Sequence, residues 1–291
     1  MKRINLLCLV FLLLAITHSS ALAQGRQVSQ EPNTAMLYYN KGVEHYRSGR
    51  YKEAVEAFQQ AIRFRPDSAE AHNNLGVTYN NLGLHTEAVK SLRQAIDLKP
   101  GLAEAHRNLG YTYYKLGQLQ EAVGAFKQAI RLRPDYALAF NDMGEAYNES
   151  GLYVEAIEAF KRAVLLKLDY AEAYNNLGIS YKRMGRYPES VEFFKRAISI
   201  SPQLIGAHNS LGIAYYNIRR YREAAKAFRE AISLTPEYAV AHFNLGVTYI
   251  ALRDRGASLE QYKILQSLNM DLATDLYNGI YRGMFLIVPD K

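Results

Sequence analysis

Hydrophobic and polar positions recur along most of this chain with one fixed period. The clearest marker is a glycine that returns every 34 residues, at Gly42, Gly76, Gly110, Gly144, Gly178, Gly212 and Gly246. A constant period of this length is typical of stacked structural repeats. The pattern therefore predicts seven copies of one small unit and leaves little chain for a separate catalytic domain.

Each unit contains two amphipathic stripes. With Ala69 as position 1, the residues at positions 4, 7, 8 and 11, and again at 17, 20, 24 and 27, are mostly apolar, aromatic or small. Spacings of three and four place them on one face of a helix. In the third unit Gly117 separates the stripes and Pro134 ends the second one. The pattern predicts helix, turn and helix, and we expect Asp67, Asp135 and Asp169 to cap the helices that follow.

Small residues are expected to set the distance between the two helices. A glycine inside a helix costs about 1 kcal/mol relative to alanine, so position 8 must gain something through packing. Position 20 is Ala or Ser in all seven units. We therefore expect the backbones to meet there, with phenylalanine at position 24 filling the wider part of the gap. These phenylalanines are Phe58, Phe126, Phe160, Phe194 and Phe228.

The two ends of the array depart from the pattern. Lys41 and His45 occupy positions 7 and 11 of the first unit, where later units are apolar or aromatic, so we expect them to face water. Position 27 is alanine in six units but Leu265 in the seventh, which predicts a different neighbour. A last helix, at about 271–281, is expected to cap the array. Leu168 replaces the usual proline and predicts a small irregularity in the fourth unit.

The units share aromatic or His at position 4, Leu-Gly at 7 and 8, Tyr at 11, Ala at 20, Phe at 24, Ala at 27 and Pro at 32. Over residues 35–268 this pattern resembles the tetratricopeptide repeat. The resemblance implies an all-α fold, a right-handed α-solenoid or superhelix of helix pairs. Residues 269–291 are expected to follow these repeats as a capping helix and an apolar tail. It also implies a concave groove, lined by the first helices, that receives an extended peptide or a partner helix.

In that family positions 2, 5, 6, 9, 12 and 13 of the first helix face the groove. Position 6 holds Asn40, Asn74, Asn108, Asp142, Asn176, Ser210 and Asn244. An Asn amide offers one acceptor and two donors, which match an extended backbone. The row is similar to the asparagine ladder of O-linked N-acetylglucosamine transferase, although no matching catalytic domain follows. The alternative is that these are ordinary polar surface residues.

Charge along the same face is uneven. The acidic residues Asp142, Glu145 and Glu149 come from the fourth unit, while Arg107 and Lys182 come from the third and fifth. One hypothesis is that this pattern selects a ligand with a basic residue near its middle. The alternative is a solvated charged face without selectivity.

Residues 1–23 resemble a secretory signal peptide, with Lys2 and Arg3 before an apolar run and a small-residue cleavage site at 21–23. An N-terminal extension, residues 24–34, would then precede the repeats. The single cysteine, Cys8, lies within the signal, so the mature chain would have no thiol. We expect export to the periplasm or the outside of the cell, with no membrane-spanning segment.

No phosphate loop, nucleophile motif or zinc motif occurs in the sequence, which predicts a non-enzymatic protein without a cofactor. Four histidines at position 4 are expected to pack rather than bind metal, because repeated residues diverge along a solenoid. The modest excess of basic residues does not indicate nucleic-acid binding. These histidines are His72, His106, His208 and His242.

The sequence favours a scaffold or adaptor that binds a protein or peptide in its groove. The alternative is a structural or self-assembling envelope component that uses its terminal or outer surfaces. An apolar run, residues 285–288, would either fold back on the last helices or dock a partner or a second copy.

Overall fold

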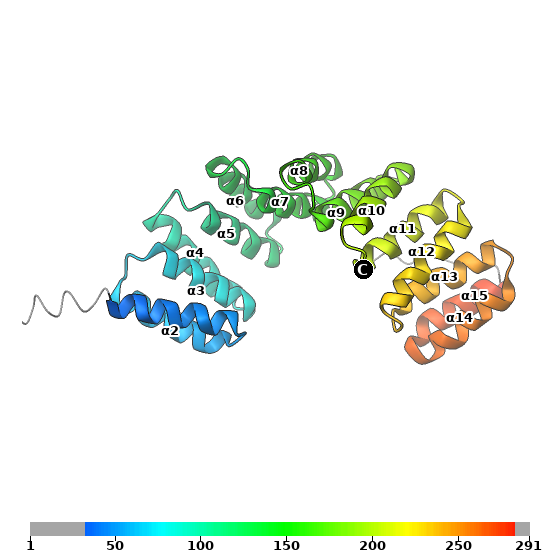
Figure 1. The fold of residues 1–291 in the computed structure, drawn as a ribbon, viewed down its shortest axis with the longest axis horizontal. Helices are drawn as coiled ribbons and strands as arrows, with labels where there is room; N and C mark the ends of the chain where they lie inside the picture. The colour runs from blue at the N-terminus through cyan, green and yellow to red at the C-terminus, as the bar shows by residue number, and fades with distance from the viewer. Residues whose placement is uncertain (1–32, 283–291) are drawn as a thin grey trace, which may run out of the picture. The chain divides into compact units, whose positions relative to one another are not determined.

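A computed structural model of the chain describes residues 33–282, which form helices joined by short turns (Figure 1). No strand occurs within that range. A first helix over residues 33–47 is followed by α2 (Tyr51–Phe64), α3 (Ala69–Asn81), α4 (His85–Leu98), α5 (Ala103–Lys115), α6 (Leu119–Leu132), α7 (Ala137–Glu149), α8 (Tyr153–Leu166), α9 (Ala171–Arg183), α10 (Tyr187–Ile200), α11 (Ile205–Asn217), α12 (Tyr221–Leu234), α13 (Ala239–Ala251), α14 (Arg255–Leu268) and α15 (Met270–Arg282).

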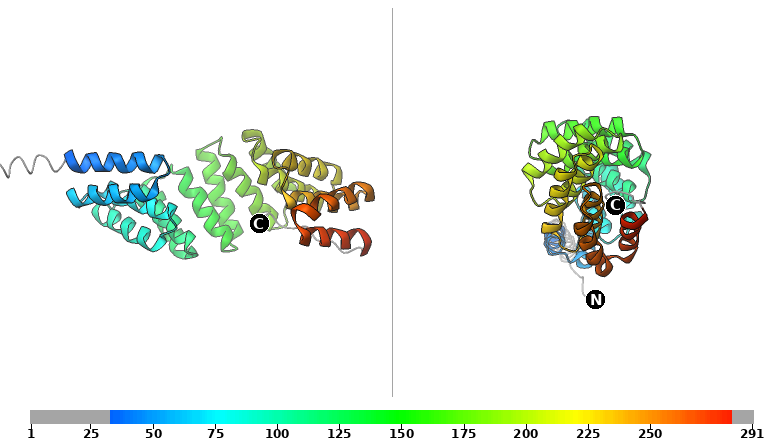
Figure 2. Two further views of the ribbon diagram at one scale, coloured as in Figure 1. Left: turned by 90° about the horizontal axis from the view of Figure 1, so that it is seen from below. Right: turned by 90° about the vertical axis from the view of Figure 1, so that its right-hand side faces the viewer.

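The helices confirm the predicted repeat and the all-α solenoid. From α3 to α13, each first helix covers positions 1 to 13 of its unit, and each second helix from α2 to α14 covers positions 17 to 30. The chain divides into two compact units, Met1–Arg133 and Pro134–Lys291. Within each unit the helices stack one beside the next, as the blue to green helices of the first unit show in Figure 2.

The turn between the two helices of a repeat requires a left-handed backbone. Position 15 has a φ of 72° to 75° in the first five repeats, where it is glycine. In the last two repeats the same conformation is adopted by Arg219 and Arg253, with φ of 61° and 62°. The geometry of the turn is therefore retained even where glycine is absent.

The glycine at position 8 makes room chiefly for the ring at position 24. A Cβ built on Gly110 would lie 2.7 Å from ring carbons of Phe126 and 3.1 Å from the backbone oxygen of Ala122. The predicted close approach of the two backbones at positions 8 and 20 is confirmed, and the ring at position 24 lies closer still to the glycine. The aromatic ring takes the space nearest to the glycine, and Phe126 is almost fully buried.

The last repeat is covered by α15. Leu265 is fully buried and clusters with Phe243 and Val247 of α13 and with Ala273 and Leu276 of α15. The larger side chain at position 27 thus packs against the helix that follows the final repeat. At the other end Lys41 is exposed as expected, whereas His45 is half-buried and its Nδ1 is inaccessible, so the expectation was wrong for His45.

Two local expectations were wrong. The expected caps Asp67, Asp135 and Asp169 lie one residue too early, because the N-cap positions are the next residues, Ser68, Tyr136 and Tyr170. Ser68 Oγ accepts from the backbone N–H of Ala71 at 3.2 Å, whereas the two tyrosines make no such bond.

Leu168 does not prolong its helix. α8 ends at Leu166, the position where the other second helices end, and the N–H of Lys167 bonds to the carbonyl of Ala163 as in those helices. The chain therefore leaves the helix before it reaches the position of the missing proline. The predicted irregularity is absent from this helix end.

The predicted signal peptide and the apolar run at 285–288 lie outside the described residues. Among the helices of residues 33–282, none has the length and apolar character required to cross a bilayer.

Candidate functional site

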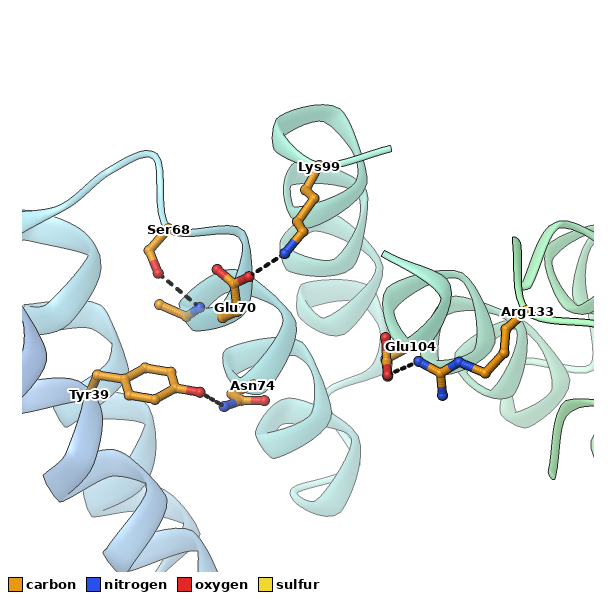
Figure 3. A network of polar contacts seen from close by, with 8 residues as sticks. Tyr39, Ser68, Glu70, Asn74, Lys99, Glu104 and Arg133 are labelled. Atoms are coloured by element: carbon orange, nitrogen blue, oxygen red, sulfur yellow. Dashed lines mark hydrogen bonds and ion pairs between the residues drawn. The ribbon is translucent and has the colours of Figure 1, made fainter. Parts of the chain in front are cut away.

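A row of side-chain amides runs along the first helices of the first unit. Asn74 Nδ2 donates to the Tyr39 hydroxyl at 2.9 Å (Figure 3), and Asn74 Oδ1 accepts from Asn73 Nδ2 at 3.2 Å. Asn108 Nδ2 then donates to Asn73 Oδ1 at 2.9 Å. These bonds form one continuous chain of polar groups across three successive first helices.

The second unit uses the same positions. Asn176 Nδ2 donates to Asn141 Oδ1 at 3.2 Å and to Glu145 Oε1 at 3.0 Å, while Asn141 Nδ2 also donates to Glu145, at 2.9 Å. Asn244 Nδ2 lies 3.3 Å from Asn209 Oδ1, and both of these residues are fully buried. These bonds connect the fourth repeat to the fifth and the sixth repeat to the seventh.

The rule behind these bonds is that position 6 donates to position 5 of the preceding repeat. The sequence predicted a ladder at position 6, but it did not predict position 5 as the acceptor. A signal was present, because position 5 is Asn73, Asn141, Asn175 and Asn209 in four repeats. Some of the donors and acceptors of these Asn side chains are therefore used in bonds between repeats. Binding of a ligand by the same amides stays a prediction.

The predicted site residues differ in exposure. Asn40 is exposed, Asn74, Asn108 and Asn176 are partly exposed, and Asn244 is inaccessible. Among the charged candidates Glu149 is exposed, and the others are half-buried: Arg107, Asp142, Glu145 and Lys182. Arg107 belongs to the first unit and the other four to the second.

Two acidic residues at position 2 form ion pairs within the first unit. Glu70 Oε1 lies 2.8 Å from Lys99 Nζ, and Glu104 pairs with Arg133 (Figure 3). The hydrogen bond from Lys99 lowers the pKa of Glu70. Each side chain is about half exposed, so solvent screening weakens both pairs. The two pairs neutralise the charges of Glu70 and Glu104.

The four histidines at position 4 connect consecutive repeats. Each Nε2 lies 2.9 to 3.1 Å from the carbonyl oxygen of the proline six residues earlier, as in His72 with Pro66 and His242 with Pro236. Because a carbonyl only accepts, Nε2 carries the hydrogen. The predicted packing role thus includes a hydrogen bond. Within residues 33–282 no group of three or more His, Cys, Asp or Glu side chains is placed to hold a metal ion.

Comparison with protein families identifies a family for this chain. The model of the Cilia and flagella-associated protein 70 C-terminal domain matches residues 13–242, which is most of the chain. No curated protein matches the sequence.

Solved structures with a similar fold include other repeat proteins. MamA protein is 29% identical, with a TM-score of 0.52, over 58% of this chain and 93% of that one. YrrB, described as a TPR protein with an unusual peptide-binding site, is 22% identical, with a TM-score of 0.55, over 64% and 97% of the two chains. A tetratricopeptide repeat protein from Parabacteroides merdae is 18% identical, with a TM-score of 0.63, over 85% and 99%. The last two likenesses concern the fold alone.

Proposed function

Because this chain belongs to the tetratricopeptide-repeat family of the Cilia and flagella-associated protein 70 C-terminal domain, we propose that it is a non-enzymatic scaffold. In this proposal the face of the first helices within a unit binds an extended peptide or a partner helix. Proteins with this repeat generally mediate protein–protein interactions, but a fold alone does not fix a function. The proposal therefore depends on the groups that this face offers.

The observation that carries the proposal is the ordered row of amides. Bonds between neighbours hold Asn73 and Asn74 in place, so a ligand would not have to order them on binding. Asn108 uses its Nδ2 for the ladder, while its Oδ1 has no partner among the described residues. Asn40 is exposed and makes no side-chain hydrogen bond to any described residue. Both amides are available to the backbone of an extended peptide.

The test is affinity capture from an envelope extract of the cell that produces the protein. The full chain is compared with a double variant, Asn40→Ala and Asn108→Ala. A matched control is Lys52→Ala with Lys90→Ala, two exposed residues of the second helices α2 and α4. We expect the amide variant to lose partners that the control retains. Equal capture by all three proteins at equal thermal stability would contradict binding at this face.

We also propose that the protein is exported, on the evidence of the signal-like residues 1–23. N-terminal sequencing of protein isolated from the envelope fraction should begin at Gln24. A chain recovered with Met1 from the cytosolic fraction would contradict this proposal.

A second candidate function, self-assembly, is favoured by two exposed leucines in the fourth repeat. Leu165 and Leu168 are 64% and 66% exposed. The next two repeats have serine and proline at these positions, as in Ser199 and Pro202. Apolar residues exposed together mark interaction surfaces more often than single ones do.

The experiment replaces Leu165 and Leu168 by the residues that the next two repeats have at these positions. Light scattering of the full chain is compared with a Leu165→Ser, Leu168→Pro variant. A mass that falls from oligomer to monomer supports self-assembly through this surface. A monomer in both proteins, or an unchanged oligomer, excludes this surface as the contact.

A further inference from the structure

A small apolar pocket opens on the face of the first helices in the first unit. Its volume is about 230 Å³. The first helix contributes Val43, Tyr46 and Arg47, and the other lining residues are Phe58 of α2 and Asn74 and Val77 of α3. The pocket thus lies beside the amide row and includes one of its members, Asn74.

The pocket exists because two successive repeats have valine at position 9. Val43 and Val77 are short, so the ring of Phe58 contributes to the lining between them. The third repeat has Tyr111 at this position, with 39% of the residue exposed. A side chain of that size would fill the same space between the first two repeats. Within the first unit, this apolar lining is therefore specific to the first two repeats.

Internal contacts fix the walls of the pocket. Phe58 is 1% exposed and occupies the space beside Gly42, where a Cβ would approach its ring to 2.6 Å. The Tyr46 hydroxyl accepts from Asn81 Nδ2 at 3.1 Å. Asn74 is held by its bond to Tyr39. A site whose walls are already ordered binds with a smaller loss of conformational freedom.

The charge at the pocket is positive. Arg47 is exposed and forms no ion pair with any described residue. Glu70 and Glu104, acidic residues at position 2, are already paired with Lys99 and Arg133. Glu44 lies on the same helix as Arg47 but does not line the pocket. A carboxylate on a ligand is therefore the complementary group.

We propose that this pocket receives one aliphatic side chain of an extended peptide, with a neighbouring carboxylate of the same peptide paired to Arg47. The inference rests on the proposed function and specifies its ligand as an acidic, aliphatic segment. Sites for whole small molecules usually measure about 300 to 1,000 Å³, so a smaller pocket fits a single side chain. The amides beside it would contact the peptide backbone, while the valines and Arg47 select the side chains.

The test uses three synthetic probes, each acetylated, amidated and labelled with fluorescein. The first has the sequence Ser-Gly-Glu-Leu-Glu-Gly-Ser, the second replaces its leucine with serine, and the third replaces both glutamates with lysine. Binding to the full chain is measured by fluorescence anisotropy. We expect the first probe to bind at least tenfold more tightly than the other two.

Two variants separate the two parts of the pocket. Val43→Tyr introduces the residue that the third repeat has at this position, and it should abolish the preference for leucine over serine. Arg47→Glu should reverse the preference for glutamate over lysine. Arg63→Glu makes the same charge change at an exposed position of α2 that does not line the pocket, and should leave both preferences intact.

Equal binding of the three probes, or no binding at millimolar concentration, would overturn the proposal. The same holds if Val43→Tyr and Arg47→Glu keep the preferences of the unmodified chain. If partners are lost with the Asn40 and Asn108 variant but are still captured by both pocket variants, the scaffold function is supported and only the pocket proposal is contradicted. If neither the amide variant nor the pocket variants lose captured partners or probe preferences, both the scaffold function and the pocket proposal are contradicted.

Discussion

Arg219 and Arg253 occupy a backbone conformation that the five earlier repeats assign to glycine. For a residue with a Cβ, the left-handed conformation costs about 1 to 2 kcal/mol. Both arginines are exposed, so packing of the side chain does not require arginine there. The cost is part of the stability of the last two repeats.

We predict that Arg219→Gly and Arg253→Gly each raise the free energy of unfolding, by up to about 1 kcal/mol. The gain is smaller than the relieved strain because glycine also has more freedom in the unfolded chain. Urea unfolding followed by circular dichroism measures the change. Arg50→Gly is the control, since Arg50 has an ordinary φ of −84° and should gain nothing. A loss of stability in both variants would contradict the strain argument.

At the residue scale, the sequence identified the structurally important positions more accurately than it identified their hydrogen-bond partners. The histidines at position 4 were recognised as structural, but the bond to the proline carbonyl depends on how one repeat joins the next. The same is true of Asn74 and Asn108, whose acceptors belong to another repeat. Periodicity shows the face of a helix and does not give distances between helices.

At the scale of the helix pair, glycine at position 8 and phenylalanine at position 24 form one packing unit. A Cβ on Gly110 would lie 2.7 Å from the Phe126 ring, closer than atoms normally approach. Phe126 is buried and cannot turn away without leaving a void. The pair thus controls how closely α5 and α6 approach.

Gly110→Ala and Gly124→Ala are predicted to have opposite effects. Both glycines are inside helices, where alanine is favoured by about 1 kcal/mol. Gly124 has open space around its Cβ position, so its variant should be more stable by about that amount. At Gly110 overpacking costs about 1 to 3 kcal/mol and outweighs the helical gain. Thermal unfolding of both variants is the measurement, and a Gly110→Ala protein more stable than the parent would contradict this account.

Helix boundaries illustrate why part of the fold could not be predicted. The spacing of apolar residues gave every helix pair, because the 3.6-residue period extends over a whole helix. The caps were missed by one residue, at Ser68 rather than Asp67, because periodicity does not resolve single residues at helix ends. The end of α8 was misjudged because proline at position 32 follows a helix that has already ended.

At the scale of the molecule, each repeat of a solenoid is stabilised mainly by its neighbours. The last described helix of the second unit is α15, which packs against α13 and α14. Leu276 of α15 is fully buried against Phe243, Val247 and Leu265. Loss of this contact should therefore act first on the end of the array.

We predict that Leu276→Ala destabilises α15 by about 2 to 5 kcal/mol, the usual cost of removing a buried leucine side chain. Hydrogen exchange followed by mass spectrometry should then show faster exchange in α13, α14 and α15, a smaller effect at α11, and no change in the first unit. This gradient follows because local opening spreads through neighbouring contacts. Asp275→Ala, at an exposed position of the same helix, should leave exchange unchanged. Uniformly faster exchange in both units would mean that the chain unfolds as one cooperative body, and nearest-neighbour stability would not describe it.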